Sequence, residues 1–167
     1  MGFGTFVAAN AASADGSAEP VESQSASAVV GATFVPIAPY RAFDSRSLPI
    51  CSGDTGPFGP NQSVVIDLGT DQNDPCNVKL PEGVVAVTYN ITAVNTVDRG
   101  FLSVAPVGSP TGSTSAVNWT ETGQIVPNGG VIGLGEAFEL PPCCIVVEMG
   151  PNGSTNFFID ITGYFIM

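Results

Sequence analysis

Two stretches of the chain alternate small or polar residues with β-branched and aromatic ones, at residues 87–94 and 156–166. A period of two is typical of half-buried strands, because successive side chains of a strand point to opposite faces. Shorter stretches with the same character lie between clusters of Gly, Pro, Asn and Ser, which are typical of turns. The predicted strands are 33–38 leading into 40–46, 63–68, 84–95, 100–106, 114–119, 130–135, 143–149 and 156–166.

Eight to ten short strands, with no convincing helix and no clean internal repeat, predict an all-β fold. We expect an antiparallel β-sandwich or a jelly-roll-like barrel. With 167 residues the chain is long enough for one domain with a proper core and short for two. We therefore predict a single β-sandwich domain over residues 33–167, preceded by an extended, low-complexity N-terminal arm over residues 1–32.

The arm differs in composition from the rest. Residues 8–28 are rich in Ala, Ser and acidic residues, a composition typical of a flexible polar tail. No Lys or Arg precedes Arg41, so the basic region of a secretory signal peptide is missing, and no apolar run reaches the length of a membrane span. We expect the arm to dock on a neighbouring subunit, with Phe3, Phe6 and Val7 as its apolar contacts.

The charge composition excludes several classes of function. Fifteen acidic residues stand against four basic ones, giving a formal net charge of −11, and charged residues make up only 11% of the chain. With no basic cluster, we expect neither nucleic acid nor an anionic membrane surface as a partner. The chain has no histidine, which removes Ser-His triads and most zinc or copper sites. The acids are scattered through loops, and 71–74 lacks a calcium-loop spacing, so we expect no catalytic residues, no metal and no cofactor.

Four cysteines remain. Cys51 and Cys76 lie in neighbouring Pro/Gly-rich loops and are the candidate intramolecular disulfide. Cys143 and Cys144 are adjacent, and in a strand they would point to opposite faces, so we expect them not both to be buried. All four cysteines reduced is the alternative if the protein stays in a cytoplasm.

Five blocks, in order, carry a resemblance to a known family. They are 39–46 (PYRAFDSR), 86–95 (AVTYNITAVN), 100–106 (GFLSVAP), 115–119 (SAVNW) and 159–165 (IDITGYF). Together they resemble a β-rich module found in bacterial cell-surface and secreted proteins and in some phage structural proteins. The resemblance covers residues 34–167. It implies a fold and no activity, because no catalytic residues are assigned to the module.

The polar residues of these blocks are best interpreted as structural. The predicted polar network comprises Asp44, Arg46, Asn90, Asn118 and Asp160. Scarce charges in a β protein are usually tethered, so we favour a structural ion pair at Asp44 and Arg46 over a clamp for a sugar or carboxylate. Trp119 and Tyr164 are expected to be core or core-edge aromatics with a hydrogen-bonded polar tip.

Three functional hypotheses remain. The first is a structural virion protein, most simply a phage capsid decoration or cement protein. It would assemble with itself, as a trimer for instance, and with a major capsid or other coat protein, and would be made in the host cytoplasm without a signal peptide. The alternative is an extracellular or cell-surface adhesion or glycan-binding module. A carboxylate-dependent hydrolase is the third, and it would need two acids facing each other in a cleft.

Overall fold

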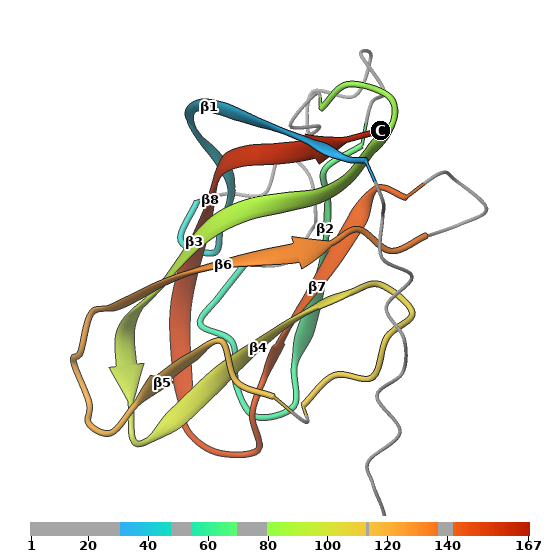
Figure 1. Cartoon of the computed structure of the whole chain (residues 1–167). Helices are drawn as coiled ribbons and strands as arrows, with labels where there is room; N and C mark the ends of the chain where they lie inside the picture. The colour runs from blue at the N-terminus through green and yellow to red at the C-terminus, as the bar shows by residue number, and fades with distance from the viewer. Residues whose placement is uncertain (1–30, 48–54, 70–79, 113, 137–141) are drawn as a thin grey trace, which may run out of the picture.

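The computed structural model describes residues 31–47, 55–69, 80–112, 114–136 and 142–167, and these contain eight strands and no helix (Figure 1). The strands are β1 (Thr33–Asp44), β2 (Ser63–Asp67), β3 (Val84–Val97), β4 (Gly100–Pro106), β5 (Val117–Trp119), β6 (Val126–Gly133), β7 (Cys144–Met149) and β8 (Ser154–Ile166).

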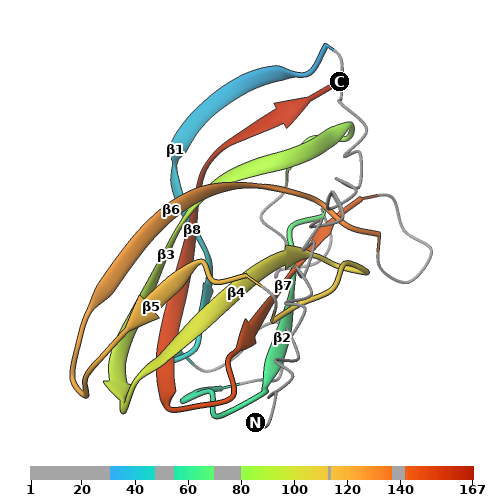
Figure 2. The ribbon, with the colours of Figure 1, turned by 60° about the horizontal axis from the view of Figure 1, so that its bottom comes forward.

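The strands form two four-stranded antiparallel sheets, in the orders β1-β8-β3-β6 and β2-β7-β4-β5. Figure 2 shows the two sheets as separate layers. The first and last strands pair with each other, and the chain passes repeatedly from one sheet to the other. This strand order is that of the jelly roll, which is built from two Greek keys. The predicted β-sandwich of jelly-roll type is confirmed.

The core lies between the two sheets, and β8 shows how the sequence builds it. Phe157, Ile159 and Ile161 are fully buried, while the residues between them, Phe158 and Asp160, lie on the outer face. Burying each such apolar side chain stabilises the fold by about 1.5–3 kcal/mol. The alternation of the sequence therefore becomes one inner and one outer face for β8, one of the two inner strands of the first sheet.

The four edge strands are β1, β6, β2 and β5, and none contains a lysine. Lysine often protects the edge strands of a sheet from pairing with other strands. On the two edges of the first sheet, prolines and irregular pairing take this role. On β1 the register shifts between Pro36 and Tyr40, and on β6 Pro127 lies in the strand. Proline cannot donate a ladder hydrogen bond, and a bulge twists the edge, so both discourage pairing with another strand.

Several predicted residues fall outside the described ranges: Phe3, Phe6 and Val7 of the arm, and the disulfide candidates Cys51 and Cys76. In the part of the chain that is described, no helix is long and apolar enough to cross a membrane.

Candidate functional site

A charged cluster lies on the outer face of the first sheet and joins β1 to β8. We call Arg41, Asp44, Arg46 and Asp160 the Arg–Asp cluster. Arg41 and Asp160 are directly paired across the two strands. The Arg41 guanidinium donates to Asp160 through Nε and through Nη2, the latter at 3.3 Å, and donates through Nη1 to Asp44 Oδ2 at 2.9 Å. Arg41 therefore holds both carboxylates at once.

Arg46 holds Asp44 from the other side. Its Nε donates to Oδ1 of Asp44 at 2.8 Å and its Nη2 to Oδ2 at 2.6 Å, while its backbone N–H donates to Oδ1 at 3.1 Å. The predicted ion pair of Asp44 and Arg46 is thus confirmed. Both guanidinium groups also lie over the Phe158 ring, at 3.9 Å for Arg41 and 4.9 Å for Arg46, a favourable arrangement for a cation and an aromatic face.

These contacts fix the protonation of Asp44. The hydrogen bond from the Arg46 side chain, aided by the charges of Arg46 and Arg41, holds the pKa of Asp44 below its ordinary value although partial burial opposes the shift. An ionised carboxylate that accepts from two guanidinium groups has no proton to give, and its lone pairs are already used. Because Asp160 is also held by Arg41, these two acids do not form the free facing pair that a carboxylate hydrolase requires.

The two predicted asparagines lie in different places. Asn90 on β3 is directly paired with Asp160, so it borders the Arg–Asp cluster. Asn118 is on β5 in the other sheet, where its side-chain N–H donates to Ser115 Oγ at 2.9 Å. The prediction of one network containing all five polar residues is therefore wrong for Asn118, because β5 and β8 belong to different sheets.

The prediction for Trp119 is correct in part. The side chain is buried in the core, at 3% exposure, but its Nε1–H has no hydrogen-bond partner among the described residues. The expected hydrogen-bonded tip is therefore wrong for Trp119 in the described part of the chain. Tyr164 packs against the core from its edge, as predicted.

The vicinal cysteines form a disulfide, Cys143–Cys144, and both are buried, at 5% and 2% exposure. The expectation that they would not both be buried is therefore wrong. The alternation of side chains applies only inside a strand, and β7 begins at Cys144, so Cys143 precedes the strand. Both sulfur atoms can then turn to the same side.

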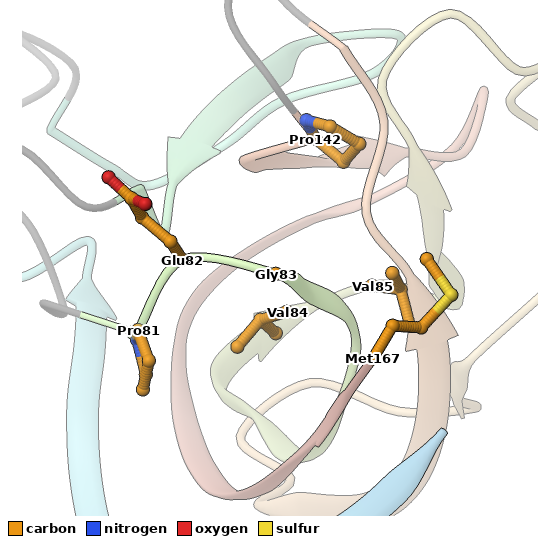
Figure 3. A pocket seen from close by; sticks show the side chains of 7 residues that line it. All are labelled: Pro81, Glu82, Gly83, Val84, Val85, Pro142 and Met167. Carbon is orange, nitrogen blue, oxygen red and sulfur yellow. The ribbon is translucent and has the colours of Figure 1, made fainter. Parts of the chain in front are cut away.

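An apolar pocket of about 500 Å³ lies at the end of the sandwich where β3 begins and β8 ends (Figure 3). Its lining residues come from the start of β3, the segment before β7 and the C-terminus: Pro81, Glu82, Gly83, Val84, Val85, Pro142 and Met167. Figure 3 shows the carboxylate of Glu82 directed away from Val84 and Met167. The space is therefore walled by apolar groups, with one acid at its border.

Exposed apolar side chains also lie at this end of the sandwich. Met167 is 72% exposed and Phe34 on β1 is 45% exposed. Thr33 pairs with Ile166, and the Met167 N–H donates to the Gly83 carbonyl at 3.1 Å, so the start of β1, the start of β3 and the end of β8 meet here. We call the pocket together with Phe34 and Met167 the apolar end. It could not be predicted from the sequence, because it arises from three segments far apart in the chain.

Comparison with family models, with curated proteins and with solved structures finds no match to this chain. The function is therefore inferred from the fold and from these sites.

Proposed function

We propose that this chain is a structural protein of a virus particle, a decoration or cement protein of a phage capsid, and that it has no catalytic activity. The observation that carries the proposal is the apolar end of a jelly-roll domain. The jelly roll is common to viral capsid domains and to lectins. The fold alone therefore does not distinguish the two functions, and the surface of this chain must decide between them.

The apolar end has the character of a contact surface. Exposed apolar groups gathered around a hollow usually mark interaction sites, whereas single exposed apolar residues need no explanation. Residues 1–32 join the domain at Thr33, directly beside Phe34, so an arm that follows a neighbouring subunit starts from this end. A specific interface buries about 800 Å² per partner, so the proposed contact combines the apolar end with such an arm. In this role the protein stabilises a shell by burying apolar area at the junctions of its subunits.

The polar surface gives less support to glycan binding. A carbohydrate platform needs an exposed aromatic face with hydrogen-bonding groups not already used by the protein. Phe158 is the aromatic side chain beside the Arg–Asp cluster, and two guanidinium groups lie over its ring. The side-chain donors and acceptors around it are largely used within the cluster.

The first test is quantitative mass spectrometry, with electron micrographs, of native material that contains this chain. We expect a fixed ratio of this chain to a major coat protein on icosahedral particles. A second step rebinds purified chain to particles stripped of it and compares Met167→Asp with Ile125→Asp. Both side chains are exposed, at 72% and 71%, but Ile125 precedes β6 at the far end of β3.

We expect Met167→Asp to lower the occupancy of the particles at least about tenfold, since it places a charge in an apolar contact, and Ile125→Asp to leave it unchanged. Recovery of the chain as a free or cell-attached species without a stoichiometric coat protein would overturn the proposal. A glycan array would then test the alternative.

A further inference from the structure

The pairing of β2 with β7 brings a carboxylate to the vicinal cysteines. Asp67 is the last residue of β2 and is directly paired with Cys144, the first residue of β7. One carboxylate oxygen of Asp67 and the two Sγ atoms of Cys143 and Cys144 all lie within 4.8 Å of one another. Asp67 is half-buried and both cysteines are buried. Three potential metal ligands therefore converge on one spot at the end of the second sheet.

The backbone around these ligands is held by hydrogen bonds that do not involve the sulfur atoms. The Leu68 N–H donates to the Cys143 carbonyl at 2.9 Å, and the Gly135 N–H donates to the Cys144 carbonyl at 2.9 Å. The Cys143 N–H donates in turn to the Gly135 carbonyl at 3.0 Å. Gly135 follows β6 of the first sheet, so this end of the sandwich is tied across both sheets. The backbone of both cysteines is thus held by the fold, and the two sulfur atoms are held together by the disulfide.

The carboxylate is also oriented. Asp67 Oδ1 accepts a hydrogen bond from the Gly69 N–H at 2.6 Å. A hydrogen bond of this kind fixes a ligating carboxylate and is the usual outer-shell support of a metal site.

We propose that reduction of the Cys143–Cys144 disulfide opens a three-ligand site for a thiophilic divalent cation of the Zn²⁺ and Cd²⁺ class. The ligands are the two thiolates and the Asp67 carboxylate, a set that suits such ions and leaves the fourth tetrahedral position to water. The site is independent of the proposed virion role. It requires no histidine, which is why the composition of the chain does not exclude it.

The Cys143–Cys144 disulfide is reduced by a reductant of the phosphine class. The phosphine attacks one sulfur and breaks the S–S bond; water then supplies the oxygen of the phosphine oxide and the protons of two thiols. The sulfur pair gains the two electrons that the phosphorus loses. When the cation binds, the two thiols become thiolates and release their protons to the solvent.

The experiment uses the full chain with Cys51→Ser and Cys76→Ser, so that Cys143 and Cys144 are its only cysteines. The chain is reduced with a phosphine, desalted under argon and titrated with Cd²⁺, with thiolate-to-Cd²⁺ charge-transfer absorption as the readout. We expect one ion per chain with proton release, and no charge-transfer band from the oxidised protein.

The carboxylate is tested with Asp67→Asn, and Asp98→Asn is the matched control. Asp98 is exposed on the turn between β3 and β4. We expect Asp67→Asn to weaken Cd²⁺ binding by at least about tenfold, the lower range seen when a supporting group of a metal site is removed, and Asp98→Asn to leave it unchanged. Equal affinity of the Asp67→Asn and parent chains, or no charge-transfer band in the reduced parent, would overturn the proposal.

A second readout decides the question even if Asp67→Asn fails to fold. The ¹¹³Cd chemical shift of the reduced parent chain depends strongly on the number of sulfur ligands. A shift in the range of two sulfur ligands with oxygen supports the site. A shift in the range of four sulfur ligands shows chains bridged through one ion and contradicts it.

Discussion

At the scale of the residue, Asp44 is where the basic side chains of the first sheet converge. It accepts hydrogen bonds from Arg41 and from both the side chain and the backbone of Arg46. Its side chain is only 13% exposed, whereas each arginine is 43% exposed. Exposed ion pairs contribute little on their own, at about 0.2–1 kcal/mol each. Two ion pairs that share one mostly buried carboxylate stabilise the fold more than two separate exposed pairs, because the shared carboxylate is already ordered.

We predict that Asp44→Asn lowers the free energy of unfolding at neutral pH by about 1 kcal/mol. The pKa of Asp44 is lowered in the folded state from its ordinary value of 3.8, chiefly by the Arg46 hydrogen bond. Its contribution is therefore fully present above pH 3.8 and is lost as the pH falls through the lowered folded-state pKa. Urea unfolding of both chains across this range measures the difference, which should shrink in acid.

The control for this prediction is Asp98→Asn. Asp98 has φ +54°, a left-handed conformation that asparagine also tolerates, and its side chain is exposed. We expect this variant to match the parent at every pH. A difference between Asp44→Asn and the parent that stays constant into acid would show that the ion pairs are not its source.

The sequence was informative about single residues where the partner is close in the chain. Asp44 and Arg46 are two residues apart, and their ion pair was predicted. Arg41 was missed as a member of the cluster, because its pairing with Asp160 depends on the register of β1 and β8, which shifts twice. Asp67 was missed beside Cys144 for the same reason. Register is a property of two strands, and the pattern of one strand does not contain it.

At the scale of the element, β8 is one of the two inner strands of the first sheet, since it pairs with both β1 and β3. Its Gly163 is paired with Pro36 on one side and Thr88 on the other. A Cβ at this position would lie 2.6 Å from the Phe34 ring and 2.9 Å from Thr88 Oγ1. The Phe34 ring, in contact with Phe165 at 5.1 Å between centroids, covers the space that a side chain would fill. The glycine therefore lets an aromatic ring bridge the two strands.

We predict that Gly163→Ala destabilises the domain by about 1–3 kcal/mol, the usual cost of overpacking. In a Phe34→Ala background the same change should cost clearly less, because the main obstacle is gone. A double-mutant cycle from urea unfolding measures this coupling.

Gly133→Ala is the matched control in the same sheet, since a Cβ there meets its nearest neighbours at 3.9 Å and 4.0 Å. We expect it to change the free energy of unfolding little. Additive effects of Gly163→Ala and Phe34→Ala would show that the ring is not what excludes a side chain.

The strands were predicted correctly where apolar and polar residues alternate strongly. They were missed where a segment is a strand only because it pairs with a neighbouring strand. The predictions at 84–95 and 156–166 match β3 and β8 within two residues. The prediction at 130–135 misses the first half of β6, because Pro127, Asn128 and Gly129 carry no apolar period. That half is a strand because β3 pairs with it. The order of the strands in the sheets has no local signal, since it depends on long-range pairing.

At the scale of the whole molecule, the charges are strongly unbalanced. Fifteen acids face four basic residues, and Arg41 and Arg46 are committed to the Arg–Asp cluster. Apart from the cluster, thirteen acids (15 − 2) stand against two basic residues (4 − 2), so repulsion between acids dominates the net electrostatics. Self-repulsion of this kind keeps a protein soluble but opposes its compact state. It also opposes the close packing of copies, so any assembly must gain from apolar contacts what it loses in charge.

We predict that the melting temperature rises as NaCl is increased from about 10 mM to about 150 mM, where the Debye length falls from about 30 Å to about 8 Å. Repulsion between distant exposed acids is screened over this range, whereas the contacts of the Arg–Asp cluster, at 2.5–3.3 Å, are screened much less. Scanning calorimetry with NaCl and with KCl separates screening from effects of a particular cation. Asp44→Asn should show the same rise from a lower starting point. A melting temperature that falls with salt would mean that attraction between opposite charges outweighs the repulsion of the acids, and the net charge of −11 would then not limit the stability of the fold.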